Sequence, residues 1–220
     1  MADRPLGLYV HVPWCRSLCP YCDFPVAVAS PDAIPHRAYR DAILTELAQR
    51  AGDFAGRQLV SIYFGGGTPS LWRTDCLRAV IDQTRATFAS APGDLEITIE
   101  ANPSDCTAEN LAEWRGSGIG RVSIGVQSME PRELVALGRD HRMGDGAAAV
   151  RAAVAAGMPR VSADIIFGVP GSLMPGDPGG TAEMAEAERC AAHVGRVAAL
   201  GPGHLSVYEL TIEERTAFGR

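Results

Sequence analysis

Residues 15–22 read CRSLCPYC and place three cysteines within eight positions, directly after a β-rich run at residues 6–12. Pro13 and Pro20 prevent a continuous helix across this segment. The chain is therefore free to turn and to bring the three sulfur atoms toward one centre. No other part of the sequence concentrates metal-ligating side chains in this way.

The chemistry of this segment depends on the number of thiols. Structural zinc takes four ligands, usually from two separated pairs, and no second pair or nearby histidine follows at that spacing. Iron–sulfur clusters are held by Cys thiolates, and a cubane held by three of them leaves one iron open to another ligand. We expect Cys15, Cys19 and Cys22 to hold such a cluster. The alternatives are a coincidental set of buried thiols and a redox pair formed by Cys19 and Cys22.

Outward from the cysteines, the chain alternates β-rich runs with stretches of helical spacing. The expected strands are residues 6–12, 59–64, 95–101, 121–126, 160–167 and 204–210. The expected helices are residues 38–51, 76–88, 108–116, 131–138 and 145–157. Such alternation predicts right-handed βαβ units and a parallel sheet. The fold class is therefore α/β, a partial (β/α)6 TIM-like barrel.

Length and composition suit one domain over residues 1–220, and a full eight-unit barrel usually takes ~250 residues. We interpret the chain as a barrel domain whose C-terminus is truncated. Residues 172–181, SLMPGDPGGT, are expected to form a loop, either an insertion or a lid. Cys76, Cys106 and Cys190 are each expected to be small buried residues.

The overall charge excludes several classes of function. The net charge is -6, which gives no basic field for nucleic acid, and neither a membrane span nor a secretory signal is found. A cytoplasmic protein is expected. All 20 basic residues are Arg, so a P-loop lysine and a lysine Schiff base are excluded.

A glycine turn follows the second expected strand at residues 65–70, GGGTPS. Glycines let a ligand approach the backbone, and the turn would lie on the same barrel face as the cysteines. The CxxxCxxC motif together with this turn resembles the radical S-adenosylmethionine (SAM) superfamily. The resemblance implies a [4Fe-4S] cluster whose open iron chelates SAM, and one-electron cleavage of SAM to a 5′-deoxyadenosyl radical.

Further polar groups stand where other strands end. Glu100, Gln127 and Asp164 would meet at the barrel mouth, because barrel geometry brings the ends of different strands together. A carboxylate such as Glu100 suits ribose hydroxyls or an ammonium group. Arg139, placed in the helix after the fourth strand, could pair with a carboxylate of SAM. Taken singly, Glu100, Gln127 and Asp164 are each more typical of a solvated or capping position.

Eight segments in order narrow the resemblance to the branch that contains coproporphyrinogen dehydrogenases (HemN) and haem chaperones (HemW). They are LYVHVPWC, CPYCDF, YFGGGTPS, TIEANP, SIGVQSM, GRDHR, DIIFGVPG and HLSVYELTIEERTAFGR. The resemblance covers residues 8 to 220. It implies that the cluster is held by the three cysteines and that SAM is bound by Tyr9, Gly66, Gly67, Thr68, Glu100, Gln127, Arg139 and Asp164.

Two departures within this branch favour the haem chaperones. The dehydrogenases carry a long arm before the cluster and a further Cys two residues past the third ligand, whereas here 14 residues precede Cys15 and Phe24 takes the Cys position. The chaperone hypothesis implies haem as a ligand, a haem-accepting respiratory protein and an electron donor such as flavodoxin or ferredoxin. The alternatives are the porphyrin-forming dehydrogenase, which would be an enzyme, and an iron–sulfur module without SAM chemistry. No histidine is singled out as a haem ligand.

Overall fold

The computed structural model describes residues 4–90, 93, 95–170 and 182–220. Its centre is a parallel sheet of six strands in the order β1-β4-β5-β6-β7-β8. The strands are β1 (Leu6–Val12), β4 (Leu59–Gly66), β5 (Glu96–Ala101), β6 (Arg121–Gln127), β7 (Arg160–Phe167) and β8 (His204–Glu209). Consecutive strands are neighbours in the sheet, as right-handed βαβ units require.

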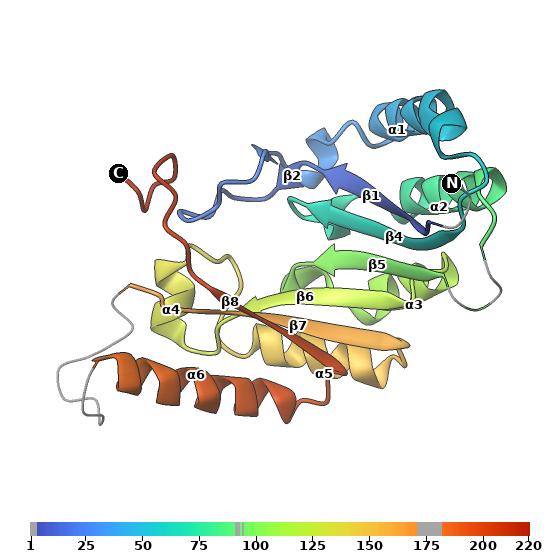
Figure 1. Cartoon of the computed structure of the whole chain (residues 1–220). Coiled ribbons are helices and arrows are strands. Elements are labelled where there is room, and N and C mark those ends of the chain that lie inside the picture. The colour runs from blue at the N-terminus through green and yellow to red at the C-terminus, as the bar shows by residue number, and fades with distance from the viewer. Residues whose placement is uncertain (1–3, 91–92, 94, 171–181) are drawn as a thin grey trace.

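Helices lie around the outside of the curved sheet (Figure 1). They are α1 (His36–Arg50), α2 (Thr74–Thr87), α3 (Ala108–Gly116), α4 (Pro131–Ala136), α5 (Asp145–Ala155) and α6 (Ala182–Ala198). The short helix α4 lies beside the carboxyl end of β6 (Figure 1). A partial (β/α)6 barrel is therefore confirmed as the fold class.

Strand residues alternate between an apolar outer face and a polar inner face. In β4, Ile62 and Phe64 are completely buried beneath the helices, whereas Tyr63 between them is only partly buried. Every second residue points to the same face of a strand, so one face supplies the core and the other is left for a ligand. The apolar outer face packs against α2 and forms the core with Leu77, Val80 and Ile81. These three residues lie on one face of α2 at helical spacing.

The sequence placed the strands within two residues of the observed bounds, whereas one helix prediction was wrong in part and one helix was missed. Helix α4 ends at Ala136, so Arg139 follows the helix instead of lying in it. Helix α6 was not predicted. Cys76 and Cys106 are buried as expected, whereas Cys190 is partly exposed. The predicted loop at residues 172–181 lies outside the described residues. Within the described residues, no helix combines the length and apolarity that a membrane span needs.

Candidate cluster and SAM site

Backbone hydrogen bonds fix the start of the cysteine segment at the end of the sheet. β2 (Trp14–Cys15) pairs in parallel with β3 (Ala27–Val28), so the chain between them forms a loop that carries Cys19 and Cys22. The amide of Thr68 donates to the Trp14 carbonyl oxygen at 2.8 Å. The first cysteine is thereby held against the glycine turn that follows β4.

The three thiols border one cavity, and two of them accept hydrogen bonds from other predicted site residues. The Thr68 hydroxyl donates to Cys15 Sγ, and Arg139 Nη1 donates to Cys19 Sγ, both at 3.5 Å. Burial raises the pKa of Cys15, which the Thr68 hydroxyl partly offsets, and burial also raises the pKa of Cys22. In the described part of the chain, no three His, Cys, Asp or Glu side chains are arranged to hold a single metal ion.

Two residues of the glycine turn are restricted to glycine by close approach. Gly66 has φ 117°, and a Cβ there would lie 2.6 Å from the His11 imidazole. A Cβ on Gly67 would lie 2.7 Å from the Trp14 carbonyl oxygen and 3.0 Å from Cys15 Sγ. The missing side chains let the turn approach the cysteine segment closely and leave open backbone at the cavity.

The cavity at the carboxyl end of the sheet has a volume of about 400 Å³. Ten of the eleven residues predicted for the cluster and SAM line it, from β2, the glycine turn, β5, β6, β7 and the segment after α4. Tyr9 is the exception, because its hydroxyl shares a hydrogen bond with His11 Nδ1 and its ring stacks on Tyr63. The structure therefore brings together all the predicted residues except Tyr9.

Two carboxylates enter the cavity and are held by hydrogen bonds from neighbouring strands. Glu100 accepts from the Tyr63 hydroxyl at 2.7 Å and from the Gly66 amide at 3.1 Å. Both oxygens of Asp164 lie 3.0 Å from the Ser123 hydroxyl. Burial raises the pKa of Glu100 and of Asp164, and the hydrogen bonds partly oppose that rise. These carboxylates are oriented acceptors for hydroxyl or ammonium groups.

Arg139 and Gln127 complete the lining opposite the glycine turn. The Nε of Arg139 is buried and has no hydrogen-bond partner, although its Nη1 contacts Cys19. Gln127 has φ 61°, a conformation that a non-glycine residue rarely adopts, at a register shift between β6 and β7. Strained backbone of this kind is typical of functional sites.

Sequence reasoning missed the residues that orient the predicted ones. Tyr63 holds Glu100, and Ser123 holds Asp164. The alternation of side chains along a strand could have predicted them, because residues two positions apart point to the same face. Tyr63 lies two positions before Gly65, and Ser123 lies two positions before Gly125. Each therefore faces the cavity side of its strand.

Comparison with known proteins agrees with this arrangement. Residues 9–174 match the Radical SAM superfamily, and the chain belongs to it. Within the superfamily, the chain is 35% identical over 215 residues to the heme chaperone HemW of Escherichia coli. The aligned region covers 98% of this chain and 53% of that protein. It is 34% identical to the mouse mitochondrial radical S-adenosyl methionine domain-containing protein 1, over 98% of this chain and 45% of the relative.

A solved structure shows the same likeness in three dimensions. Coproporphyrinogen III oxidase (HemN) of Escherichia coli, described as a radical SAM enzyme, superimposes with a TM-score of 0.80 at 29% identity. The match covers 100% of this chain and 48% of that one. The chain thus spans about half the length of the relatives that it matches.

The residues present fit the two groups that the superfamily implies. Three free thiols border the cavity, and the buried Nε of Arg139 still lacks an acceptor there. Gly67 leaves room at the point where a side chain would meet Cys15 Sγ. The donor set is thiolate, and carboxylates, an amide and a guanidinium surround it, which suits an iron–sulfur cluster beside a zwitterionic ligand.

Proposed function

We propose that this chain is the core domain, residues 1–220, of a haem chaperone that binds a [4Fe-4S] cluster and SAM. The observation that carries the proposal is the single cavity that collects three cysteines, the glycine turn and the polar ends of three strands. Several curated relatives that match at 35% identity over 98–100% of this chain are heme chaperones named HemW. The exposed Phe24 beside the third cysteine further supports this assignment, since it lines the cavity without offering a metal ligand.

Each part of the site has a distinct task in the proposal. Cys15, Cys19 and Cys22 hold the cluster, which when bound supplies one electron and an open iron for SAM. The Gly66–Thr68 turn presents backbone to the ligand. Glu100 and Asp164 accept hydrogen bonds from hydroxyl or ammonium groups of the ligand, and they enter the cavity from different strands. The remaining contacts to SAM are Gln127, Arg139 and, after a movement toward the ligand, Tyr9.

Cluster binding is tested by reconstituting the full-length protein under anaerobic conditions. We expect four irons per chain and a broad visible absorption in the wild-type protein. Cys19→Ala should lose both, whereas Cys76→Ala, which removes a buried thiol that does not line the cavity, should retain the cluster. Four irons and an unchanged visible band in Cys19→Ala would refute the ligand assignment.

SAM binding is tested on the same reconstituted protein. SAM should change the EPR signal of the reduced cluster, because it coordinates the open iron. An unchanged signal in a fully loaded protein would instead support an iron–sulfur module without SAM chemistry.

A second candidate function is decarboxylation of coproporphyrinogen III, favoured by the TM-score of 0.80 to HemN over the whole chain. The full-length protein distinguishes the two. A chaperone should give a Soret band with added haem and no protoporphyrinogen IX from coproporphyrinogen III. Formation of that product without a haem-induced Soret band would overturn the chaperone proposal in favour of the enzyme.

The proposal also includes a cellular setting. A HemW-like protein would act in the cytoplasm, take an electron from a donor such as flavodoxin or ferredoxin and pass haem to a respiratory protein. Transfer of haem from the loaded full-length protein to a candidate acceptor, followed by the Soret spectra of both, tests this part. Retention of haem by the donor in the presence of every respiratory acceptor would refute it.

A further inference from the structure

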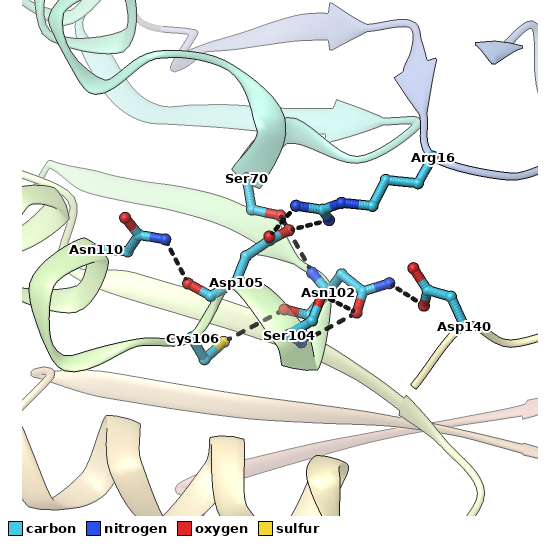
Figure 2. A network of polar contacts seen from close by, with 8 residues as sticks. All are labelled: Arg16, Ser70, Asn102, Ser104, Asp105, Cys106, Asn110 and Asp140. Atoms are coloured by element: carbon cyan, nitrogen blue, oxygen red, sulfur yellow. Dashed lines mark hydrogen bonds and ion pairs between the residues drawn. The ribbon is translucent and has the colours of Figure 1, made fainter. Parts of the chain in front are cut away.

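A buried carboxylate outside the cavity lining joins the cysteine segment to the sheet. Asp105 ends the short 3-10 helix Pro103–Asp105 that follows β5, and it is only 5% exposed. It accepts hydrogen bonds from Arg16 Nη1 at 3.0 Å, from Arg16 Nη2 at 2.6 Å and from the Ser70 hydroxyl at 2.6 Å. Figure 2 shows both guanidinium nitrogens and the hydroxyl converging on this one carboxylate.

Asp105 and its two partner residues come from segments that are far apart in sequence. Arg16 directly follows Cys15, and Ser70 closes the glycine turn, so Asp105 connects the cluster segment, the turn and the end of β5. A bidentate Arg–carboxylate pair fixes orientation as well as distance, which a single hydrogen bond does not. Asp105 therefore fixes the orientation of the Arg16 guanidinium, next to Cys15 in the sequence.

The contacts continue to the residue next to Arg139. The backbone amide of Asn102 donates to the Ser70 hydroxyl at 3.2 Å, and the Asn102 side chain donates to Asp140 at 3.0 Å (Figure 2). Arg16, Asn102 and Asp140 line the cavity, whereas Asp105 does not. Asp105 therefore acts on the site only through its partners.

We infer that Asp105 is the positioning residue of the cluster segment, and that its ion pair with Arg16 fixes the cysteines relative to the glycine turn. The inference rests on the proposed function for the identity of the cluster. It predicts an electrostatic effect as well as a mechanical one, because Asp105 compensates the charge of Arg16 beside the first cysteine.

The mechanical part is tested on the metal-free full-length protein by hydrogen exchange. Asp105→Asn keeps the shape but removes the charge, and amides of residues 16–24 should exchange at least about tenfold faster, as expected for loss of a charged hydrogen bond. Asp75→Asn is the matched control, because Asp75 makes the same bidentate pair with Arg73 on an exposed surface. Equal exchange of residues 16–24 in the two variants would overturn the inference.

Ser70→Ala is a second variant, used in case Asp105→Asn does not fold. It removes one of the three hydrogen bonds to Asp105 and leaves the ion pair in place. We expect a smaller acceleration in the same residues. No acceleration in a folded Ser70→Ala protein, together with none in Asp105→Asn, would exclude a positioning role.

The electrostatic part uses the midpoint potential of the reconstituted cluster at pH 8. Asp105→Asn leaves Arg16 uncompensated and should raise the potential, whereas Arg16→Gln leaves a negative charge and should lower it. Loosening of the segment alone would shift both variants in the same direction and would overturn this part. If wild-type protein takes up no cluster on reconstitution, the proposed function is refuted. Hydrogen exchange of the metal-free protein would still decide whether Asp105 positions residues 16–24.

Discussion

Replacing Gly67 by alanine tests whether the glycine turn needs its close approach to the cysteine segment. The added Cβ would lie 2.7 Å from the Trp14 carbonyl oxygen and 3.0 Å from both Cys15 Sγ and the carbonyl carbon of Pro13. Two of these are backbone atoms, so the strand that carries Cys15 must move by roughly 0.7 Å to reach ordinary contact. Such overpacking costs about 1–3 kcal/mol.

Two measurements separate the effects of this substitution. Urea unfolding of the metal-free protein should show a free energy of unfolding lower by about 1–3 kcal/mol, and anaerobic reconstitution should yield fewer irons per chain than wild type. Gly120→Ala is the control, because a Cβ there would contact nothing within 4 Å. The reasoning is refuted if Gly67→Ala matches Gly120→Ala in both stability and iron content.

Three further predictions concern the cavity and the core. Arg139→Ala should weaken SAM binding about tenfold or more, because a buried charged donor is lost, and calorimetry on the reconstituted protein measures this. Burial raises the pKa of Glu100, so the folded state keeps that proton longer than the unfolded state does. The free energy of unfolding should then fall as pH rises from the ordinary value of 4.5 through the raised pKa. Urea unfolding of Glu100→Gln at several pH values should show a shallower fall. The same dependence on pH in Glu100→Gln and wild type would contradict the raised pKa of Glu100. Phe64→Ala should cost about 3–5 kcal/mol because Phe64 is fully buried, whereas Phe24→Ala, at a side chain 68% exposed, should change the unfolding free energy by less than about 0.5 kcal/mol.

The fold was predictable because its strands carry an unmistakable local pattern. β1 and β7 were expected with the bounds that the structure shows, since apolar residues alternate along each, and Pro13 and Gly168 follow their last residues. Helix α6 was missed because its sequence is rich in Ala and Glu and follows the Gly- and Pro-rich residues 172–181. No residue in this stretch clearly marked where a helix would begin. Arg139 was assigned to the helix after the fourth strand, whereas α4 ends at Ala136 and Arg139 follows it.

The site was predictable to the extent that its residues stand at strand ends. Glu100, Gln127 and Asp164 reach one cavity because parallel strands end at the same edge of the sheet. The ion pair between Arg16 and Asp105 was not predictable, because it joins positions 89 residues apart. Neither residue carries a local signal for the other. The roles of the eleven predicted residues in cluster and SAM binding stay predictions.

The residues after β8 fold back onto the cysteine segment. The amide of Phe218 donates to the Pro20 carbonyl oxygen at 3.0 Å, and Arg215 pairs with Asp23 at 2.6 Å. Both contacts join parts of the chain that leave the ribosome at very different times. At ordinary synthesis rates, Phe218 emerges about 10–40 s after Pro20. During that interval the loop that carries Cys19 and Cys22 lacks both of these contacts, so its final packing is completed only after the residues that follow β8 have been made.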